Sequence, residues 1–197
     1  LIENFPNEKD YEDSKEIETM FQQIHHALRA DKPIQPVLMN CANNKLTGGG
    51  GIDDAFHVMC SGLSSDMTGW KDHSKDKFYF QGEKVPYNWN EGGNCAGQAF
   101  VHDEQMDFHA NARTQGYVLQ AVGPNGTTSD FTDKNAFLKS VKDTYKSVIQ
   151  SYLDFLETKS SKSHKDFPLV LSNVSSDVFK HKDVSQAELN QALFDAL

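Results

Sequence analysis

The sequence predicts an α/β fold: a three-layer α/β/α sandwich around a mixed, mostly parallel sheet. Segments with helical periodicity alternate along the chain with short, continuous apolar segments typical of strands buried on both faces. The chain has 197 residues, of which 38% are hydrophobic, which is enough apolar material for one buried core. Ligands of such sheets lie at the carboxyl ends of the strands. We therefore expect a single domain over residues 1–197, with its site in the loops after Met39, Val122 and Leu171.

The first part of the chain predicts a helix, a strand and a second helix. Asp13 and Glu16 form a capping box in front of apolar residues at helical spacing: Ile17, Met20, Phe21, Ile24 and Leu28. Residues 37–39 are a short apolar run that suits a buried strand. After a loop with four glycines, the helical pattern resumes at residues 52–59, and Gly62 is the expected stop.

The middle of the chain predicts an insertion followed by two strands. Residues 64–94 are polar and aromatic without a sustained period, and we expect an insertion there with one hairpin. Residues 99–101 and 117–122 have the composition of strands, and Asn125-Gly126 predicts a turn after the second of them.

The last part of the chain predicts a long helix, a short strand and a final helix. The helix spans about 133–157, with these residues on its inner face: Phe137, Val141, Val148, Tyr152 and Leu156. Residues 167–171 form another buried-strand pattern. The final helix begins with a capping box of Ser185 and Glu188 and keeps one apolar side: Leu189, Ala192, Leu193 and Leu197.

Charge and composition exclude several classes of function. Asp plus Glu total 28 and Lys plus Arg total 19, so the net charge is −9, and such a chain repels the phosphate backbone of DNA. No apolar run approaches the roughly 18 residues that span a bilayer. Three cysteines without a C-x-x-C pair favour reduced thiols. We therefore expect a cytoplasmic location, with neither DNA nor a membrane as partner.

The segment from residue 37 to residue 62 carries the clearest chemical signal. A strand leads into glycines, which remove every Cβ that would keep a ligand away from the backbone. The loop ends at a helix N-terminus, which favours a phosphate or an oxygen-rich sugar. Asp53 and Asp54 lie in the first turn, where acidic residues also simply complement the helix dipole. The loop lacks the Gly-Lys-Ser/Thr of a Walker A motif and the spacing of a dinucleotide fingerprint.

This segment resembles the macrodomain signature, in which a strand ending in N-A-A-N is followed by a glycine-rich loop and a G-G-G-V-D-x-x-I-H helix start. The matching residues are 37–43 (VLMNCAN), 46–53 (LTGGGGID) and 55–57 (AFH). Downstream, residues 95–99 (CAGQA) resemble the C-x-x-G-x-A strand entry, and residues 116–124 (GYVLQAVGP) resemble the Y-V-I-H-x-V-G-P strand. Residues 167–172 stand where the family has its last core strand.

Macrodomains bind ADP-ribose, and many remove it from modified proteins. The resemblance implies that Asn43 contacts the distal ribose and that Asn40 braces the loop from the strand end. Asp53 matches the acid that orients or activates water in hydrolytic members. Asp54 is a second acid that either assists proton transfer to the leaving group or faces solvent. The loop expected against the distal ribose and diphosphate comprises Gly48, Gly49, Gly50, Gly51 and Ile52.

The sequence departs from the family pattern at the adenine site and in the second ligand loop. No counterpart of the N-terminal G-D-I element is found. The second loop, normally S-x-G-[IV]-[FY]-G, contains no glycine here. Serine hydroxyls and backbone N–H groups would then line the phosphates, from Ser172, Asn173, Ser175 and Ser176. Phe179 either stacks on adenine or ribose or packs against the protein.

The resemblance implies an ADP-ribosyl hydrolase that acts on mono-ADP-ribosylated proteins, with arginine as one conceivable linkage. A module that only binds ADP-ribose and an ADP-ribose 1″-phosphatase are the alternatives. We expect a monomer with no cofactor and no metal. Cys41 is expected to be a small buried side chain instead of a nucleophile, and His57 a structural residue. His102, Asp103 and His109 are joined by no third imidazole or thiolate at zinc-like spacing, so we expect no metal there.

Overall fold

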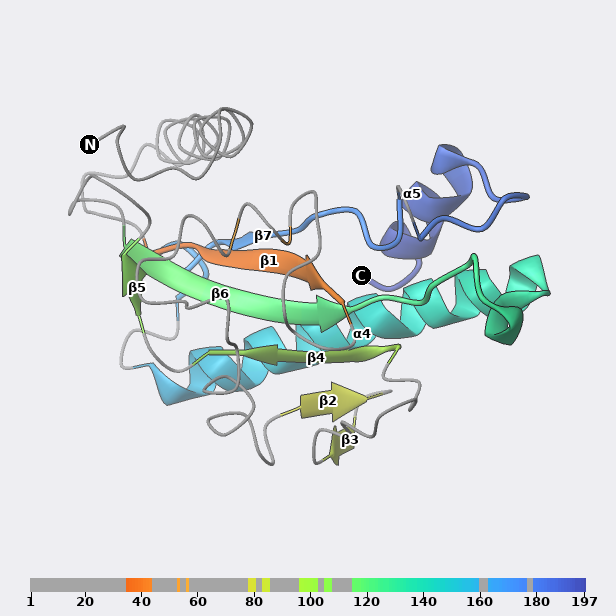
Figure 1. The fold of residues 1–197 in the computed structure, drawn as a ribbon. Helices are drawn as coiled ribbons and strands as arrows, with labels where there is room; N and C mark the ends of the chain where they lie inside the picture. The colour runs from red at the N-terminus through yellow and green to blue at the C-terminus, as the bar shows by residue number, and fades with distance from the viewer. Residues whose placement is uncertain are drawn as a thin grey trace.

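The computed structural model describes residues 35–43, 53, 56, 78–80, 83–85, 96–102, 105–107, 115–159, 163–176 and 179–197 (Figure 1). The first predicted helix, most of residues 44–62 and most of the expected insertion lie outside these ranges. Within them, a mixed sheet and two helices form the α/β architecture that the sequence predicts.

The sheet runs in the order β3-β2-β4-β6-β1-β7, and β5 pairs with β6. Its strands are β1 (Val37–Ala42), β2 (Phe78–Phe80), β3 (Glu83–Val85), β4 (Gln98–Val101), β5 (Met106–Asp107), β6 (Gln115–Val122) and β7 (Leu169–Val170). The mixed sheet is confirmed. Its described parallel pairs are β1 with β6 and β1 with β7, and the other described pairs are antiparallel.

The expected hairpin in residues 64–94 is confirmed, because β2 and β3 pair antiparallel. This hairpin belongs to the main sheet, since β2 also pairs with β4. Tyr79 of β2 is buried, and its hydroxyl bonds to Asp154. Burial is the main cause of the raised pKa of Tyr79, and the hydrogen bond to Asp154 adds to it. The hairpin thereby extends the sheet over the long helix instead of standing apart from it.

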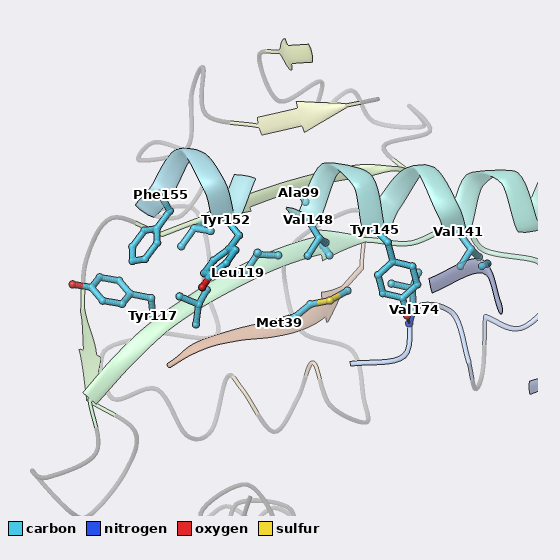
Figure 2. Packing of buried hydrophobic residues seen from close by; sticks show 14 of the residues in the cluster. Met39, Ala99, Tyr117, Leu119, Val141, Tyr145, Val148, Tyr152, Phe155 and Val174 are labelled. Atoms are coloured by element: carbon cyan, nitrogen blue, oxygen red, sulfur yellow. Dashed lines mark hydrogen bonds between the residues drawn. The ribbon is translucent and has the colours of Figure 1, made fainter. Parts of the chain in front are cut away.

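Helix α4 (Lys134–Thr158) covers one face of the sheet (Figure 1). It is the long helix that the sequence predicts at about 133–157, and the prediction is confirmed. Asp133 caps it by accepting hydrogen bonds from the N–H groups of Asn135 and Ala136. All the predicted inner-face residues are buried. Figure 2 shows Val141, Val148 and Tyr152 on the side of α4 that faces the central strands, where the apolar side chains include Met39, Ala99 and Leu119.

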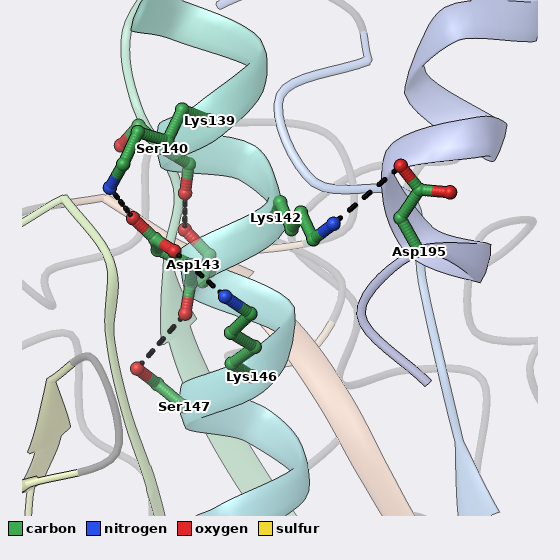
Figure 3. A network of polar contacts seen from close by, with 8 residues as sticks. Lys139, Ser140, Lys142, Asp143, Lys146, Ser147 and Asp195 are labelled. Carbon is green, nitrogen blue, oxygen red and sulfur yellow. Dashed lines mark hydrogen bonds and ion pairs between the residues drawn. The ribbon is translucent and has the colours of Figure 1, made fainter.

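Polar contacts join α4 to itself and to helix α5 (Gln186–Phe194) (Figure 3). The largely buried Asp143 forms ion pairs with Lys139 and Lys146 on neighbouring turns. Lys142 lies 3.6 Å from the Asp195 carboxylate, just beyond the end of α5. The three lysine side chains are 34% to 69% exposed, so each pair adds only slightly to stability.

The final helix begins as the sequence predicts. The Ser185 hydroxyl accepts from the Glu188 N–H, and the Glu188 carboxylate accepts from the Ser185 N–H at 2.9 Å, which completes the capping box. Contact with Lys134 and the hydrogen bonds from Ser185 hold the pKa of Glu188 at about 2. The prediction for Leu197 was wrong: it is 69% exposed, because α5 ends at Phe194 and the helical stripe stops with it.

The opposite face of the sheet is also occupied. Asp53 and Phe56, both helical, are 4% and 2% exposed. Asp53 hydrogen-bonds the side chain of Asn40, which alternates with the α4-facing Met39 and Cys41 along β1. These two residues therefore belong to the other layer of the sandwich. No helix in the described part of the chain is long and apolar enough to cross a membrane.

The core under α4 predicts a sharp contrast between two phenylalanines. Phe137 is fully buried, whereas Phe194 is 69% exposed. Phe137→Ala should lower the free energy of unfolding by about 3–5 kcal/mol, because it empties a packed site. The matched variant Phe194→Ala should change it by less than about 0.5 kcal/mol. Urea denaturation of both variants measures the difference, and equal losses would contradict the packing described here.

Candidate functional site

Asn40, Asn43 and Asp53 meet at the end of β1. Asp53 follows Asn43 by 10 residues and Asn40 by 13 residues in the sequence. Asn40 Nδ2 donates to Asp53 Oδ1 at 2.8 Å. Asp53 Oδ2 accepts from Asn43 twice, from its backbone N–H at 3.3 Å and from its side-chain Nδ2 at 3.4 Å. The Asp53 carboxylate thus ties the carboxyl end of the strand to the helix that follows the glycine loop.

This contact fixes how the Asn43 side chain is oriented. An ionised carboxylate only accepts hydrogen bonds, so the amide must present its nitrogen to Asp53. Its oxygen is then directed elsewhere, at a half-buried position beyond the last residue of the strand. The Asp53 carboxylate therefore decides which atom of the Asn43 amide faces it.

A glutamine that the sequence analysis does not single out completes this cluster. Asn40 Nδ2 also donates to Gln120 Oε1 at 2.9 Å. The two residues are partners in the parallel register of β1 and β6, and both are fully buried. The signal in the sequence is a single long polar residue inside the otherwise apolar run 117–122, whose pattern predicts a strand but no role for this residue.

The other face of the same strand end carries Cys41. Its Sγ lies 3.2 Å from Ser172 Oγ and 3.5 Å from the carbonyl oxygen of Asn173. Burial raises the pKa of the thiol from 9.0 to about 11, and the nearby charge of Asp53 adds to this effect. A thiol with this pKa is protonated at neutral pH and is a poor nucleophile. This agrees with the expectation that Cys41 is not a nucleophile, although its side chain is half-buried instead of fully buried.

Tyr145 of α4 holds residues 172–174 of the second loop through hydrogen bonds to their backbone. Its hydroxyl donates to the carbonyl of Ser172 at 3.1 Å and accepts from the N–H of Val174 at 2.9 Å. Burial raises the pKa of this phenol to about 12, so it remains a donor. Sequence periodicity placed other residues of this helix on its inner face, but nothing local identified Tyr145 as the contact to this loop.

The serine hydroxyls of the second loop all bind protein carbonyls. Ser172 Oγ donates to Met39 O at 2.8 Å, Ser175 Oγ to Pro124 O at 2.6 Å, and Ser176 Oγ to Asn173 O at 3.2 Å. The sequence-based expectation gave these hydroxyls to phosphates. In this structure Ser172 binds strand β1, Ser175 binds the loop after β6, and Ser176 binds within its own loop.

Ser175 and Gly123 lock the loops after β6 and β7 together. Ser175 has φ 52°, a left-handed conformation that few residues other than glycine adopt. A Cβ on Gly123 would overlap Val174 Cγ1 and Ser175 Oγ. The absence of a side chain at Gly123 is therefore what allows the two loops to approach so closely.

Several expected site residues lie outside the described residues: Gly48, Gly49, Gly50, Gly51, Ile52 and Asp54. The same holds for His57, Asp103 and His109. Phe179 is described and is 37% exposed. Its carbonyl accepts from the N–H of Gly126 at 2.8 Å, which fixes its backbone beside the turn after β6. In the part of the chain that the structure describes, no group of three or more His, Cys, Asp or Glu side chains is placed to hold a metal.

Comparisons with known proteins give matches among solved structures alone. No family model and no curated protein matches the sequence. The chain is similar to the Oceanobacillus iheyensis macrodomain with ADP, with a TM-score of 0.49 and 15% identity over 84% of this chain and 68% of that chain. It is also similar to the same macrodomain with MES bound, with a TM-score of 0.48 and 16% identity over 84% and 68%.

The buried thiol and phenol predict a loss of stability at alkaline pH. The pKa of Cys41 rises from 9.0 to about 11 and that of Tyr145 from 10.0 to about 12 on folding. The unfolded chain loses these protons at lower pH than the folded chain, so the free energy of unfolding should fall from about pH 9 to about pH 12. Tyr145→Phe should make this fall shallower in urea titrations at several pH values, and an unchanged slope would contradict the assignment.

The interlocked loops predict that Gly123→Ala destabilises the protein. The added methyl group must push Val174 and Ser175 away, which should cost about 1–3 kcal/mol of unfolding free energy. Urea denaturation gives the free energy. Ligand affinity should weaken in the same variant, and a fully stable Gly123→Ala protein would show that the loops separate at no cost.

Proposed function

We propose that this protein binds ADP-ribose and removes mono-ADP-ribose from modified proteins. The observation that carries the proposal is the meeting of Asn43 and Asp53 at the carboxyl end of β1. The sequence around them resembles the macrodomain signature, and parallel sheets bind ligands at this edge.

The geometry suggests separate roles for the two side chains. The Asn43 oxygen, turned away from Asp53, would accept a hydrogen bond from a hydroxyl of the distal ribose. Cleavage at the anomeric carbon passes through a state with positive charge on the sugar ring. The Asp53 carboxylate would stabilise that charge and orient the attacking water, because its bonds from Asn43 are long enough to yield to a stronger donor.

The second loop would bind the diphosphate through its backbone. Its serine hydroxyls are engaged with Met39, Pro124 and Asn173, and the N–H of Val174 is engaged with Tyr145, so we assign the anion to the other N–H groups of the loop. Phe179 stands exposed at the end of this loop and would stack on the adenine or a ribose. The proposed partner is a mono-ADP-ribosylated protein, with a cytoplasmic monomer as the acting form.

A non-catalytic ADP-ribose reader is the second candidate, and one observation favours it. Asp53 is 4% exposed and both its oxygens already accept hydrogen bonds from asparagines. A carboxylate held in this way also serves purely to brace the strand end. Both candidates predict binding of ADP-ribose, and they differ in whether a label is released.

Asp53→Asn separates the two candidates. It keeps the size of the side chain but removes the charge, so release of ADP-ribose from a labelled protein should fall about 100-fold or more. The affinity for free ADP-ribose should change by less than about tenfold, because most contacts of the ligand remain. Calorimetry and a panel of proteins carrying radioactive ADP-ribose through defined linkages give the two readouts.

The neighbouring acid provides the control. Asp54→Asn changes the charge by the same amount one residue away, and it should retain most of the turnover if Asp53 is the acting acid. ADP-ribose binding without release from any labelled protein would establish the reader instead. Absence of both binding and release would rule out the proposed function.

A further inference from the structure

A chain of buried side chains runs from the middle of the sheet to the proposed site. The side-chain nitrogen of Asn40 on β1 donates both of its hydrogens. One goes to Gln120 Oε1 on β6 at 2.9 Å, and the other goes to Asp53 Oδ1 at 2.8 Å. Gln120 and Asn40 are fully buried and Asp53 is 4% exposed. The parallel register sets Asn40 directly beside Gln120, which places both side chains on the same face.

The carboxylate sets the direction of every hydrogen bond in this chain. Because an ionised carboxylate accepts only, Asn40 must turn its nitrogen toward Asp53. The second hydrogen of that nitrogen then points at Gln120, whose side-chain oxygen must accept it. If the Gln120 amide were reversed, two NH2 groups would face each other.

We infer that Gln120 is a positioning residue for the site. Its oxygen holds the Asn40 amide in the one orientation that reaches Asp53, and Asp53 in turn orients the Asn43 amide. This inference rests on the proposed function for its consequence in turnover, but the orientation itself is a property of the free protein.

Filling of space does not account for a glutamine at this position. Asn40 Oδ1 and Gln120 Nε2 are buried and have no hydrogen-bond partner among the described residues. Burying such atoms is costly, and a methionine of similar volume would avoid that cost at Gln120. What the glutamine adds is an acceptor at the distance that Asn40 requires.

Three substitutions isolate that acceptor. Gln120→Met keeps the volume and removes the oxygen. Gln120→His returns an acceptor nitrogen, and histidine is the residue at this place in the Y-V-I-H-x-V-G-P pattern. Val118→Ala is the matched control, since Val118 is fully buried on the same strand and face and has no polar side chain.

The first readout is spectroscopic and needs no substrate. In protein labelled with 15N-asparagine, the Asn43 side-chain signal is identified by its loss in Asn43→Ala. Hydrogen exchange of this side-chain amide should become about tenfold faster in Gln120→Met, as expected when a buried polar chain loses one partner. It should remain as in the wild type in Val118→Ala and should return toward it in Gln120→His.

The second readout is turnover of ADP-ribosylated protein, corrected for the folded fraction. The kcat of Gln120→Met should fall about tenfold with KM nearly unchanged, since orientation of the reacting groups is lost and not ligand contacts. If Gln120→Met does not fold, Gln120→Asn replaces it, because the shorter side chain withdraws its oxygen from Asn40.

The outcomes separate the inference from the proposed function. Faster exchange of the Asn43 amide in Gln120→Met alone supports the positioning role, even if the wild type releases no ADP-ribose and the hydrolase proposal fails. Exchange that is equal in the wild type and in Gln120→Met, or equally fast in Val118→Ala, overturns it, whatever the turnover.

Discussion

The parallel pairing of β1 with β6 is the constraint on which the site depends. Its register runs without a break from Val37 beside Tyr117 to Ala42 beside Val122. Because parallel strands end at the same edge, the loops that follow them leave the sheet together. A shift by one residue would turn Asn40 toward α4 and would separate it from Asp53. The polar cluster is therefore as fixed as the sheet itself.

Helix α4 provides the second constraint, because it builds the core and also holds a ligand loop. Its apolar side packs on the central strands, and Tyr145 in the same row bonds to the backbone of Ser172 and Val174. Nearby, Tyr152 donates to the carbonyl of Phe167 at 2.6 Å, just before β7. Two phenols thus hold the chain just before and just after β7. This short strand is therefore held in place by more than its pairing with β1.

Local signals predicted the elements well and the side-chain partners poorly. The capping box at Ser185, the long helix and the strand at the start of the motif were all identified from short windows of sequence, because capping and periodicity are local properties. The serines of the second loop were expected to face an anion. They bind carbonyls from other parts of the chain, such as Pro124, which no local pattern reveals.

The sequence alone determined the class of fold, the glycine loop at the end of a strand, and the acid at the start of the next helix. Each of these follows from the order and spacing of neighbouring residues. The tertiary structure alone decided that Gln120 touches Asn40 across 80 positions and that burial raises the pKa of the Cys41 thiol to about 11. Such contacts depend on strand register and burial, which are set by the packing of the whole sheet and not by any one segment.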